Sequence, residues 1–392
     1  MRKPLLYSAA AQCYNKVQQL DTERRMNKLK HYNVCLPNYS IGADCYKEIG
    51  HFARYYGKKA VVIGGKTAMA KSKAALLDGI AGTDIEIMDF IWYGGDSTYE
   101  NGDALIANET VQKADIIFGV GGGRACDTCK YVANEMDKPL FTFPTVGSNC
   151  ASVTAICVIY NPDGSFREYY YPKIAEHTFI NSEIIADSPY ELLWAGIGDA
   201  LSKECEAVFS SKNANLSHTP LMGVQLSKIC TEPLVDYGKA ALEACREKKV
   251  TEALEQVVLD IIISTGLVSN MTTQMPNYYY NASLAHCVYY GSTVTAEGHK
   301  HLHGEIVALG VLCLLAYDGQ LEQRDRIMKF NSDMGFPVCF DDLGIKEEEF
   351  EAMAEKAMTS TEWEFRPKDV TKEKFIQCMK DQNQAGRAFK EK

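Results

Sequence analysis

Short apolar runs rich in β-branched residues alternate with amphipathic segments in the first half of the chain. The runs AVVIGG, IEIMDF, DIIFGV and PLFTFP begin at residues 60, 85, 115 and 139. The segments between them, such as AKSKAALLDGI and CDTCKYVANEM, carry apolar residues at helical spacing. Strands that alternate with helices in this way are typical of βαβ units. The pattern therefore predicts an α/β fold built on a parallel sheet.

Two further segments flank this region. The first thirty residues are polar and helix-like, so we expect residues 1–30 to form a helical extension, and Tyr32–Leu36 is predicted to be the first strand. The segment SVTAICVIYNPDGSFREYYY begins at residue 152 and predicts two strands joined at an NPDG turn.

The periodicity changes near residue 188. Ser188, Pro189 and Glu191 have the pattern of a capping box, in which Ser188 would cap a helix that begins at Pro189. Beyond this point almost every segment is helical by period, including EALEQVVLDIIISTGLVSNM and EIVALGVLCLLAYDG. We therefore predict an α/β domain over residues 31–187 and an all-helical domain over residues 188–392.

The composition narrows the class of protein. The chain has 392 residues, 46% of them hydrophobic, and a formal net charge of -10. Nucleic-acid binding normally needs a basic surface, so we expect no nucleic-acid partner. The apolar run Ile306–Ala316 is too short to span a bilayer, and no signal peptide is evident. We therefore expect no membrane partner. Because the 14 cysteines are spread singly, we expect reduced thiols and a cytoplasmic location.

A glycine-rich turn follows the strand DIIFGV and precedes a helix. The turn, GVGGGR, occupies residues 119–124. Glycines allow the backbone to approach a ligand, and a helix N-terminus offers free N–H groups, which together suit a pyrophosphate. A tight strand-to-helix turn with no ligand is the alternative. The turn matches neither G-x-G-x-x-G on the first strand nor a P-loop, and Cys126 and Cys129 have no second pair with which to bind a metal.

One carboxylate and two imidazoles form a second candidate site in the helical half. Asp199 lies in GIGDAL, His286 in ASLAHCVYYG and His303 in HKHLHGE. Three protein ligands of these types leave a coordination position open, as in catalytic zinc sites. The alternative is that the histidines are ordinary core or surface residues.

Four motifs, taken together and in this order, resemble a known family. They are GGGRACDTCK with the following PTVGSNC segment, GIGDAL, A-H-x-x-x-x-G and H-G-E-x-V-A. The chain resembles the glycerol dehydrogenase branch of the metal-dependent (iron-containing) alcohol dehydrogenase superfamily over roughly residues 35–375. The resemblance implies a Rossmann-like dinucleotide domain followed by a helical domain, the dehydroquinate synthase-like fold. It also implies hydride transfer between an alcohol and a nicotinamide.

The resemblance assigns roles to individual residues. Asp199, His286 and His303 fall on the metal ligands of the family. The pyrophosphate-loop positions are Gly122, Gly123, Arg124 and Asp127. The positions beside the nicotinamide half are Thr145, Ser148, Thr154, Ile156 and Tyr160.

Three departures from the family pattern affect the expected chemistry. Lys203 stands where the iron enzymes have a fourth histidine ligand, which favours zinc over iron. Cys150 replaces an aspartate that holds the polyol in glycerol dehydrogenases. A cysteine at this position resembles the hydroxycarboxylate dehydrogenase relatives, which reduce 2-oxo acids. The alternative is that the thiol only fills space in the core. Gly65 and Lys66 replace an aspartate that accepts from the adenosine ribose, which favours NADP over NAD.

The sequence therefore predicts an NAD(P)-dependent, metal-dependent alcohol dehydrogenase or carbonyl reductase. Its substrate would be a small polyol, an aldehyde or a 2-oxo acid, and the chain is expected to form a homo-oligomer. Two alternatives remain open: a lyase of the dehydroquinate synthase type, and a descendant without catalytic activity that binds a nucleotide. The helical half lacks the Lys and Arg cluster that the lyase would use for a phosphate.

Overall fold

The computed structural model of the chain describes residues 33–391. Residues from Cys35 to the C-terminus form one compact unit. The helical extension expected over residues 1–30, and Tyr32 of the expected first strand, lie outside the described residues.

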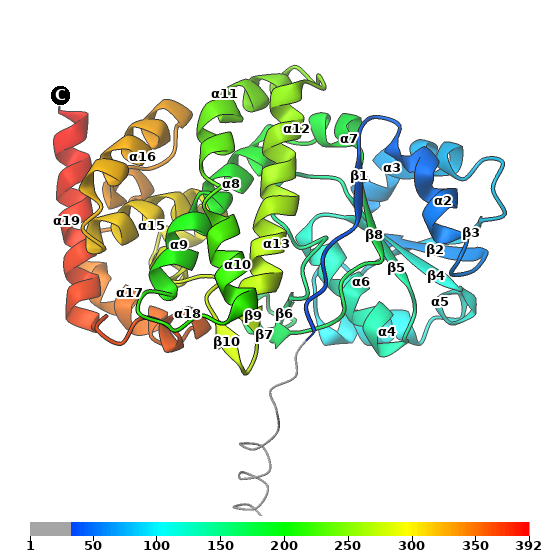
Figure 1. Cartoon of the computed structure of the whole chain (residues 1–392), viewed down its shortest axis with the longest axis horizontal. Coiled ribbons are helices and arrows are strands. Elements are labelled where there is room, and N and C mark those ends of the chain that lie inside the picture. The colour runs from blue at the N-terminus through cyan, green and yellow to red at the C-terminus, as the bar shows by residue number, and fades with distance from the viewer. Residues whose placement is uncertain (1–32, 392) are drawn as a thin grey trace, which may run out of the picture. The chain divides into compact units, whose positions relative to one another are not determined.

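A six-stranded parallel sheet forms the N-terminal part of this unit (Figure 1). The strands stand in the order β1-β8-β5-β4-β2-β3, and every neighbouring pair is parallel. Their bounds are β1 (Tyr39–Ile41), β2 (Lys59–Gly64), β3 (Glu86–Trp92), β4 (Ile116–Gly121), β5 (Leu140–Pro144) and β8 (His177–Ile180). The predicted α/β fold with a parallel sheet is confirmed.

Helices cover both faces of the sheet, as its alternating side chains require. On one face Val62, Phe118 and Phe141 pack under the short 3-10 helix η1 (Cys45–Glu48), α2 (Ile49–Ala53) and α3 (Lys66–Gly79). On the other face Val61 and Ile117 pack under α4 (Tyr99–Ile106), α5 (Glu109–Lys113) and α6 (Gly123–Glu135). The buried strands read as continuous apolar runs for this reason.

The order of the strands creates a switch point between β2 and β4. The chain leaves β2 toward β3 at one edge and then crosses to β4 on the other side of β2. Ligands of open α/β sheets bind at the carboxyl ends of the strands at such a point. The segments that follow β2 and β4 are the two glycine-containing segments singled out from the sequence.

The first strand lies elsewhere than the sequence predicts. The structure has no regular element over residues 33–38, and β1 begins only at Tyr39. Its three residues pair with β8, with Tyr39 beside Thr178 and Ile41 beside Ile180. Pairing with β8, rather than the local β propensity of residues 32–36, therefore places this strand.

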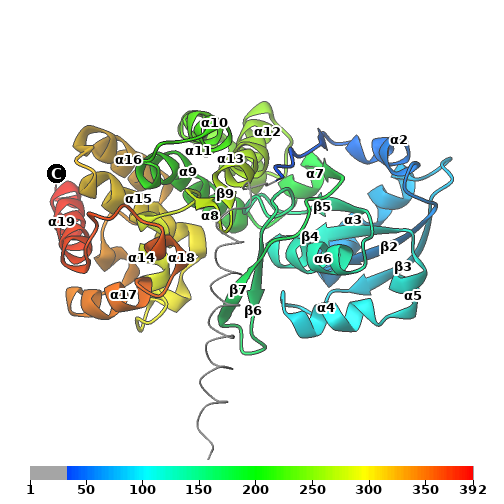
Figure 2. The same cartoon turned by 60° about the horizontal axis from the view of Figure 1, so that its bottom comes forward.

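The predicted strand pair is confirmed as an antiparallel hairpin of β6 (Cys157–Tyr160) and β7 (Phe166–Tyr170). Its turn is closed by the backbone N–H of Asn161, which donates to Ser165 O at 2.8 Å. The hairpin lies between the sheet and the helical part (Figure 2). Partly buried hydrogen bonds hold it on both sides: Val158 N–H donates to Asp127 Oδ2 at 2.9 Å, and the Tyr169 hydroxyl donates to Glu362 Oε1 at 3.1 Å.

The remainder of the described chain is helical apart from the two-residue strands β9 (Thr273–Gln274) and β10 (Tyr278–Tyr279). The helices are α7 (Ser182–Ala186), α8 (Tyr190–Ala200), α9 (Ser202–Ser210), α10 (His218–Ser227), α11 (Glu232–Arg246), α12 (Glu252–Leu259), α13 (Thr265–Thr272), α14 (Leu284–Ser292), α15 (His303–Tyr317), α16 (Leu321–Met334), α17 (Phe350–Ala357), α18 (Thr361–Glu364) and α19 (Lys372–Lys390). The expected boundary at residue 187 falls between α7 and α8 and stays a prediction.

The predicted capping box at Ser188 is wrong. Helix α8 begins at Tyr190, with Pro189 at the N-cap position and no side-chain cap. Pro189 has extended backbone (ψ 121°), so Ser188 stands one residue too early to reach the first free N–H groups.

The central helices of this part are strongly apolar. Helix α12, a π-helical turn (Asp260–Ser264) and α13 form one run, Glu252–Thr272, that is long and apolar enough to cross a membrane. Because 72% of its most apolar window is buried inside the protein, we interpret the run as a core helix. Helix α15 contains the apolar segment Ile306–Ala316 and packs against α8, α14 and α19.

Candidate active site

Three helices bring together the predicted metal ligands. Asp199 is the penultimate residue of α8, His286 lies in the first turn of α14, and His303 is the first residue of α15. One donor atom from each side chain lies within 4.8 Å of the others. The structure therefore assembles a carboxylate and two imidazoles that are widely separated in the sequence.

The Asp199 carboxylate is the centre of this triad. Its Oδ1 lies 3.1 Å from His303 Nε2 and 3.4 Å from His286 Nε2. Burial alone would raise the pKa of Asp199, but the two imidazoles outweigh it and hold the pKa far below its usual range. The group is therefore ionised, as a metal ligand must be.

Two glycines allow α8 and α15 to approach closely enough to form the triad. A Cβ at Gly304 would lie 1.7 Å from the carbonyl oxygen of Ala195, and one at Gly198 would lie 2.3 Å from Gly304 O. No larger residue fits without moving backbone. Because Gly198 precedes Asp199 and Gly304 follows His303, this contact sets the distance between the two side chains.

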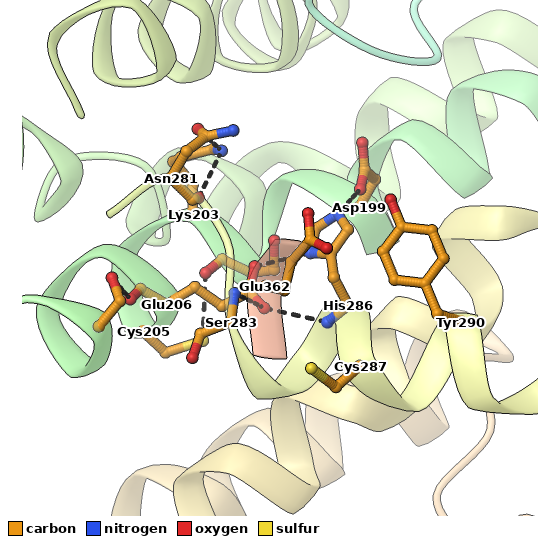
Figure 3. Close-up of polar contacts among 12 residues, drawn as sticks. Asp199, Lys203, Cys205, Glu206, Asn281, Ser283, His286, Cys287, Tyr290 and Glu362 are labelled. Carbon is orange, nitrogen blue, oxygen red and sulfur yellow. Dashed lines mark hydrogen bonds and ion pairs between the residues drawn. The ribbon is translucent and has the colours of Figure 1, made fainter. Parts of the chain in front are cut away.

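Glu206 of α9 orients the third member of the triad, and the sequence analysis missed it. Its fully buried carboxylate lies 2.7 Å from His286 Nδ1 and also accepts the backbone N–H groups of Ser283 and His286 (Figure 3). With Nδ1 held there, Nε2 faces Asp199. A carboxylate behind a histidine is the usual support of a metal-binding imidazole. The one indication in the sequence is its spacing: Glu206 is an acidic residue two helical turns after Asp199.

We predict that Glu206→Ala lowers the affinity for a divalent metal by about 10–100-fold, because His286 would lose the bond that fixes its ring. Glu206→Gln keeps an acceptor of the same size and should lose less. Competition with a chromophoric chelator measures the affinity of both variants. Wild-type affinity in Glu206→Ala would show that the ring is held by packing alone.

The two glycine-containing segments lie side by side at the switch point of the sheet. Gly65 N–H donates to Val120 O at 3.3 Å, and a Cβ at Gly121 would lie 3.8 Å from Gly65 N. Gly121 has φ +149°, a conformation that L side chains rarely adopt. Helices α3 and α6 begin at these segments with no side-chain cap, so their first N–H groups are available to an anion.

Several predicted cofactor residues surround these segments. A Cβ at Gly122 would meet the Val146 side chain at 3.1 Å, and one at Gly123 would meet Asn149 at 2.8 Å, so the loop after Thr145 covers the glycine turn. The Arg124 guanidinium lies 4.9 Å from the centre of the Tyr160 ring. Arg124 also forms an ion pair with Asp96 at 3.3 Å.

Asp127, Thr154 and Ile156 meet at a buried lysine that the sequence analysis did not single out. Lys130 Nζ lies 2.9 Å from Asp127 Oδ1 and donates to the backbone oxygens of Thr154 and Ile156. Lys130 is 1% exposed. Asp127 thus bonds to Lys130 and to the backbone of Val158, and Lys130 in turn holds the 154–156 loop in place. The contact of Asp127 with a cofactor stays a prediction.

A tight contact joins the cofactor loop to the metal-ligand helix. A Cβ at Gly196 would lie 2.1 Å from Gly147 O and 2.9 Å from Ser148 Cα. Gly196 stands in α8 three residues before Asp199. Ser148, predicted to line the nicotinamide, therefore lies beside the helix that carries the first metal ligand.

Cys150 lies at the end of the same loop, against the helical core. A Cβ at Gly266 of α13 would approach Cys150 Cβ to 3.5 Å. Burial raises the pKa of the Cys150 thiol, opposed by the charge of Lys203. The thiol is therefore neutral at physiological pH. The Lys203 ammonium itself donates to Asn281 Oδ1 at 2.8 Å and to Asn281 O at 3.2 Å (Figure 3).

Comparison with known proteins gives a consistent picture. Residues 37–181 match the family described as iron-containing alcohol dehydrogenase. The chain is 32% identical over 311 residues to a glycerol dehydrogenase of Thermotoga maritima, covering 76% of this chain and 82% of that protein. It is 30% identical over 264 residues to hydroxycarboxylate dehydrogenase A of Escherichia coli, covering 67% and 71%. The structure of a glycerol dehydrogenase from Schizosaccharomyces pombe superposes with a TM-score of 0.80 at 23% identity, covering 92% and 93%.

A parallel sheet with glycine turns at its switch point, joined to a helical part that carries the triad, defines a metal-dependent oxidoreductase that acts on CH–OH groups. The chain belongs to the iron-containing alcohol dehydrogenase family, and within it to the glycerol dehydrogenase-like members. The resemblance inferred from the four sequence motifs is thereby confirmed.

Proposed function

We propose that the protein catalyses NAD(P)-linked interconversion of an alcohol and a carbonyl compound at a divalent metal. The metal would be held by Asp199, His286 and His303. The observation that carries this proposal is the packing of Gly147 and Ser148 on Gly196. This packing puts the predicted nicotinamide loop beside the ligand helix, and hydride transfer needs both partners within a few ångströms.

The donor set fits a catalytic metal of the zinc type. Three ligands of mixed nitrogen and oxygen type leave a position open for substrate. Lys203 stands where the iron enzymes have their fourth ligand, and its amine is bonded to Asn281. We therefore propose zinc rather than iron.

The chain's own residues then have distinct tasks. A bound metal would supply Lewis-acid stabilisation of the substrate oxygen, and a nicotinamide would exchange hydride with the carbon. Glu206 keeps the His286 ring in the orientation that directs Nε2 to Asp199. The Tyr289 ring packs edge-on against His303 with centroids 4.1 Å apart, which limits the rotation of that imidazole.

We propose that NADP is preferred over NAD. Lys66 Nζ lies 4.4 Å from the centre of the Trp92 ring. No acidic residue in the described range forms an ion pair with Lys66, so its charge is available to a 2′-phosphate. An aspartate at Gly65 would instead accept from a 2′-hydroxyl and repel a phosphate.

We predict that Gly65→Asp reverses the coenzyme preference. Gly65 has φ -71° and ψ 143°, and a Cβ there would meet other atoms only at 3.7 Å or more, so the side chain can be accommodated. The ratio of kcat/KM for NADPH to that for NADH should exceed one in the wild type and fall below one in the variant. Gly65→Ala is the matched control for the added side chain. Equal use of both coenzymes in all three proteins would place the ribose elsewhere.

We propose that the substrate is a small aldehyde or a 2-oxo acid rather than glycerol. A carboxylate at position 150 would accept hydrogen bonds from a vicinal diol and would repel an anionic substrate. The neutral Cys150 thiol does neither. Sites that bond a hydroxyl discriminate strongly against compounds lacking it, so this replacement should shift specificity by a large factor.

The corresponding experiment compares glycerol oxidation with pyruvate and acetaldehyde reduction. We expect poor glycerol oxidation by the wild type and at least an about tenfold gain in kcat/KM for glycerol in Cys150→Asp, since one charge-assisted hydrogen bond is restored. Cys150→Asn has the same shape without the charge and should gain less. Efficient glycerol oxidation by the wild type, with no turnover of any 2-oxo acid, would overturn the proposal.

We propose a cytoplasmic location as well. Every cysteine among residues 33–391 is free, which suits a reducing compartment. The expected homo-oligomer stays a prediction, and sedimentation of the purified protein would test it.

A further inference from the structure

Lys203 is a buried cation without a counter-ion. It is 7% exposed, and no residue in the described part of the chain forms an ion pair with it. The buried Lys130 differs, because Asp127 lies 2.9 Å from its amine. Buried charges in proteins are normally paired or coordinated to a metal. Among the described residues, Lys203 therefore has no carboxylate at ion-pair distance.

The amine of Lys203 is held in place and keeps a free donor. Its two hydrogen-bond acceptors, the side-chain and backbone oxygens of Asn281, belong to one neutral residue. A lysine ammonium has three N–H donors. Asn281 thus positions the charge without neutralising it.

Lys203 lies in the first turn of α9, directly after the helix that carries Asp199. It follows Asp199 by four residues, and Leu201 between them keeps helical backbone angles, so both side chains project from one face of this helical stretch (Figure 3). The charge of Lys203 also acts on the Cys150 thiol, as does that of Asp199. The Lys203 ammonium is thus near enough to Cys150, which replaces the polyol-binding carboxylate, for its charge to lower the pKa of the thiol.

We propose that Lys203 is a specificity-determining residue that binds the carboxylate of a 2-oxo acid substrate through its free N–H donor. This inference rests on the proposed function and selects the 2-oxo acid from the classes proposed above. The substrate carboxylate would supply the missing counter-charge. It would also be held at a second point, so that the 2-oxo group takes a fixed orientation relative to Asp199, His286 and His303. An uncharged aldehyde would leave the ammonium unpaired.

The test compares pyruvate with acetaldehyde, which differ by the carboxylate. We expect Lys203→Met to lower the ratio of kcat/KM for pyruvate to that for acetaldehyde at least about tenfold, the effect of losing one charge-assisted hydrogen bond, chiefly through KM for pyruvate. Lys203→Arg keeps the charge and should retain part of the ratio. Lys239→Met, an exposed lysine of α11, is the matched control. Metal content and thermal unfolding are measured for each variant.

A second variant keeps the test informative if Lys203→Met does not fold. Asn281→Asp is nearly isosteric and places a carboxylate against the amine, so it should lower the same ratio while Lys203 stays in place. An unchanged ratio in the folded Lys203 and Asn281 variants, with pyruvate turned over by the wild type, would overturn this inference alone. Reduction of acetaldehyde but of no 2-oxo acid by the wild type would overturn it together with the proposed substrate. Absence of any NAD(P)-linked turnover would contradict the proposed function itself.

Discussion

His303→Ala is expected to lower kcat/KM by about a thousandfold or more and to reduce the bound metal in the purified protein. A site of three protein ligands cannot lose one and keep its affinity. The Lewis-acid stabilisation that a metal supplies amounts to several kcal/mol, and each ~1.4 kcal/mol corresponds to a factor of ten in rate. Asp199→Ala and His286→Ala should behave alike, since Asp199 Oδ1 lies near both imidazoles.

His299 provides the matched control for this prediction, because it is an exposed histidine four residues before His303. His299→Ala should retain activity and metal. Elemental analysis of each protein gives the metal content, and it also tests the preference for zinc. Stoichiometric iron with little zinc in the wild type would contradict that preference, and full activity in His303→Ala would remove the triad from the reaction.

Gly304→Ala is expected to lower the free energy of unfolding by about 3 kcal/mol or more and to weaken metal binding. Overpacking usually costs ~1–3 kcal/mol when side chains can adjust. Here the added methyl group would lie 1.7 Å from a backbone oxygen of α8, so the two helices must separate. Separation of α8 from α15 also moves Asp199 away from His303. Denaturant unfolding and chelator competition measure the two effects.

Gly238→Ala is the control for the glycine prediction. Gly238 also lies inside a helix, α11, but a Cβ there would meet only the ends of side chains: Met334 at 3.3 Å, Phe330 at 3.5 Å and Ile197 at 3.7 Å. Alanine favours a helix over glycine by about 1 kcal/mol, so this variant should be neutral or stabilised. Equal unfolding midpoints for Gly304→Ala and Gly238→Ala would show that α8 and α15 can adjust freely.

The sequence predicts those parts of the fold that local pattern determines. Strands β2, β4 and β5 are recognisable because both faces of the sheet are covered, so each strand is a continuous apolar run. Strands β1 and β8 have only three and four residues. Their place depends on the pairing of β1 with β8 and of β8 with β5, which no local periodicity shows. For this reason the sequence places the first strand too early in the chain.

The same distinction applies to the site. The residues singled out as metal ligands stand in recognisable motifs, and the structure brings them together. Glu206 could not be found in this way, because an ionisable residue on a helix reads as solvent-exposed until its buried partner is known. Lys130 ends the motif GGGRACDTCK, but its pairing with Asp127 appears only in the structure. For Lys203 the sequence shows only that a lysine stands where the iron enzymes have their fourth ligand, a histidine. Its lack of a counter-ion is a property of the assembled helices.

The β6–β7 hairpin links the sheet part of the molecule to the helical part. One strand is bonded to α6 through Asp127, and the other is bonded to the helical part through Glu362, with the Tyr169 hydroxyl also 2.6 Å from that of Tyr290. Both attachments are partly buried, which limits competition with water. A rotation of the helical part relative to the sheet would therefore pivot near the hairpin.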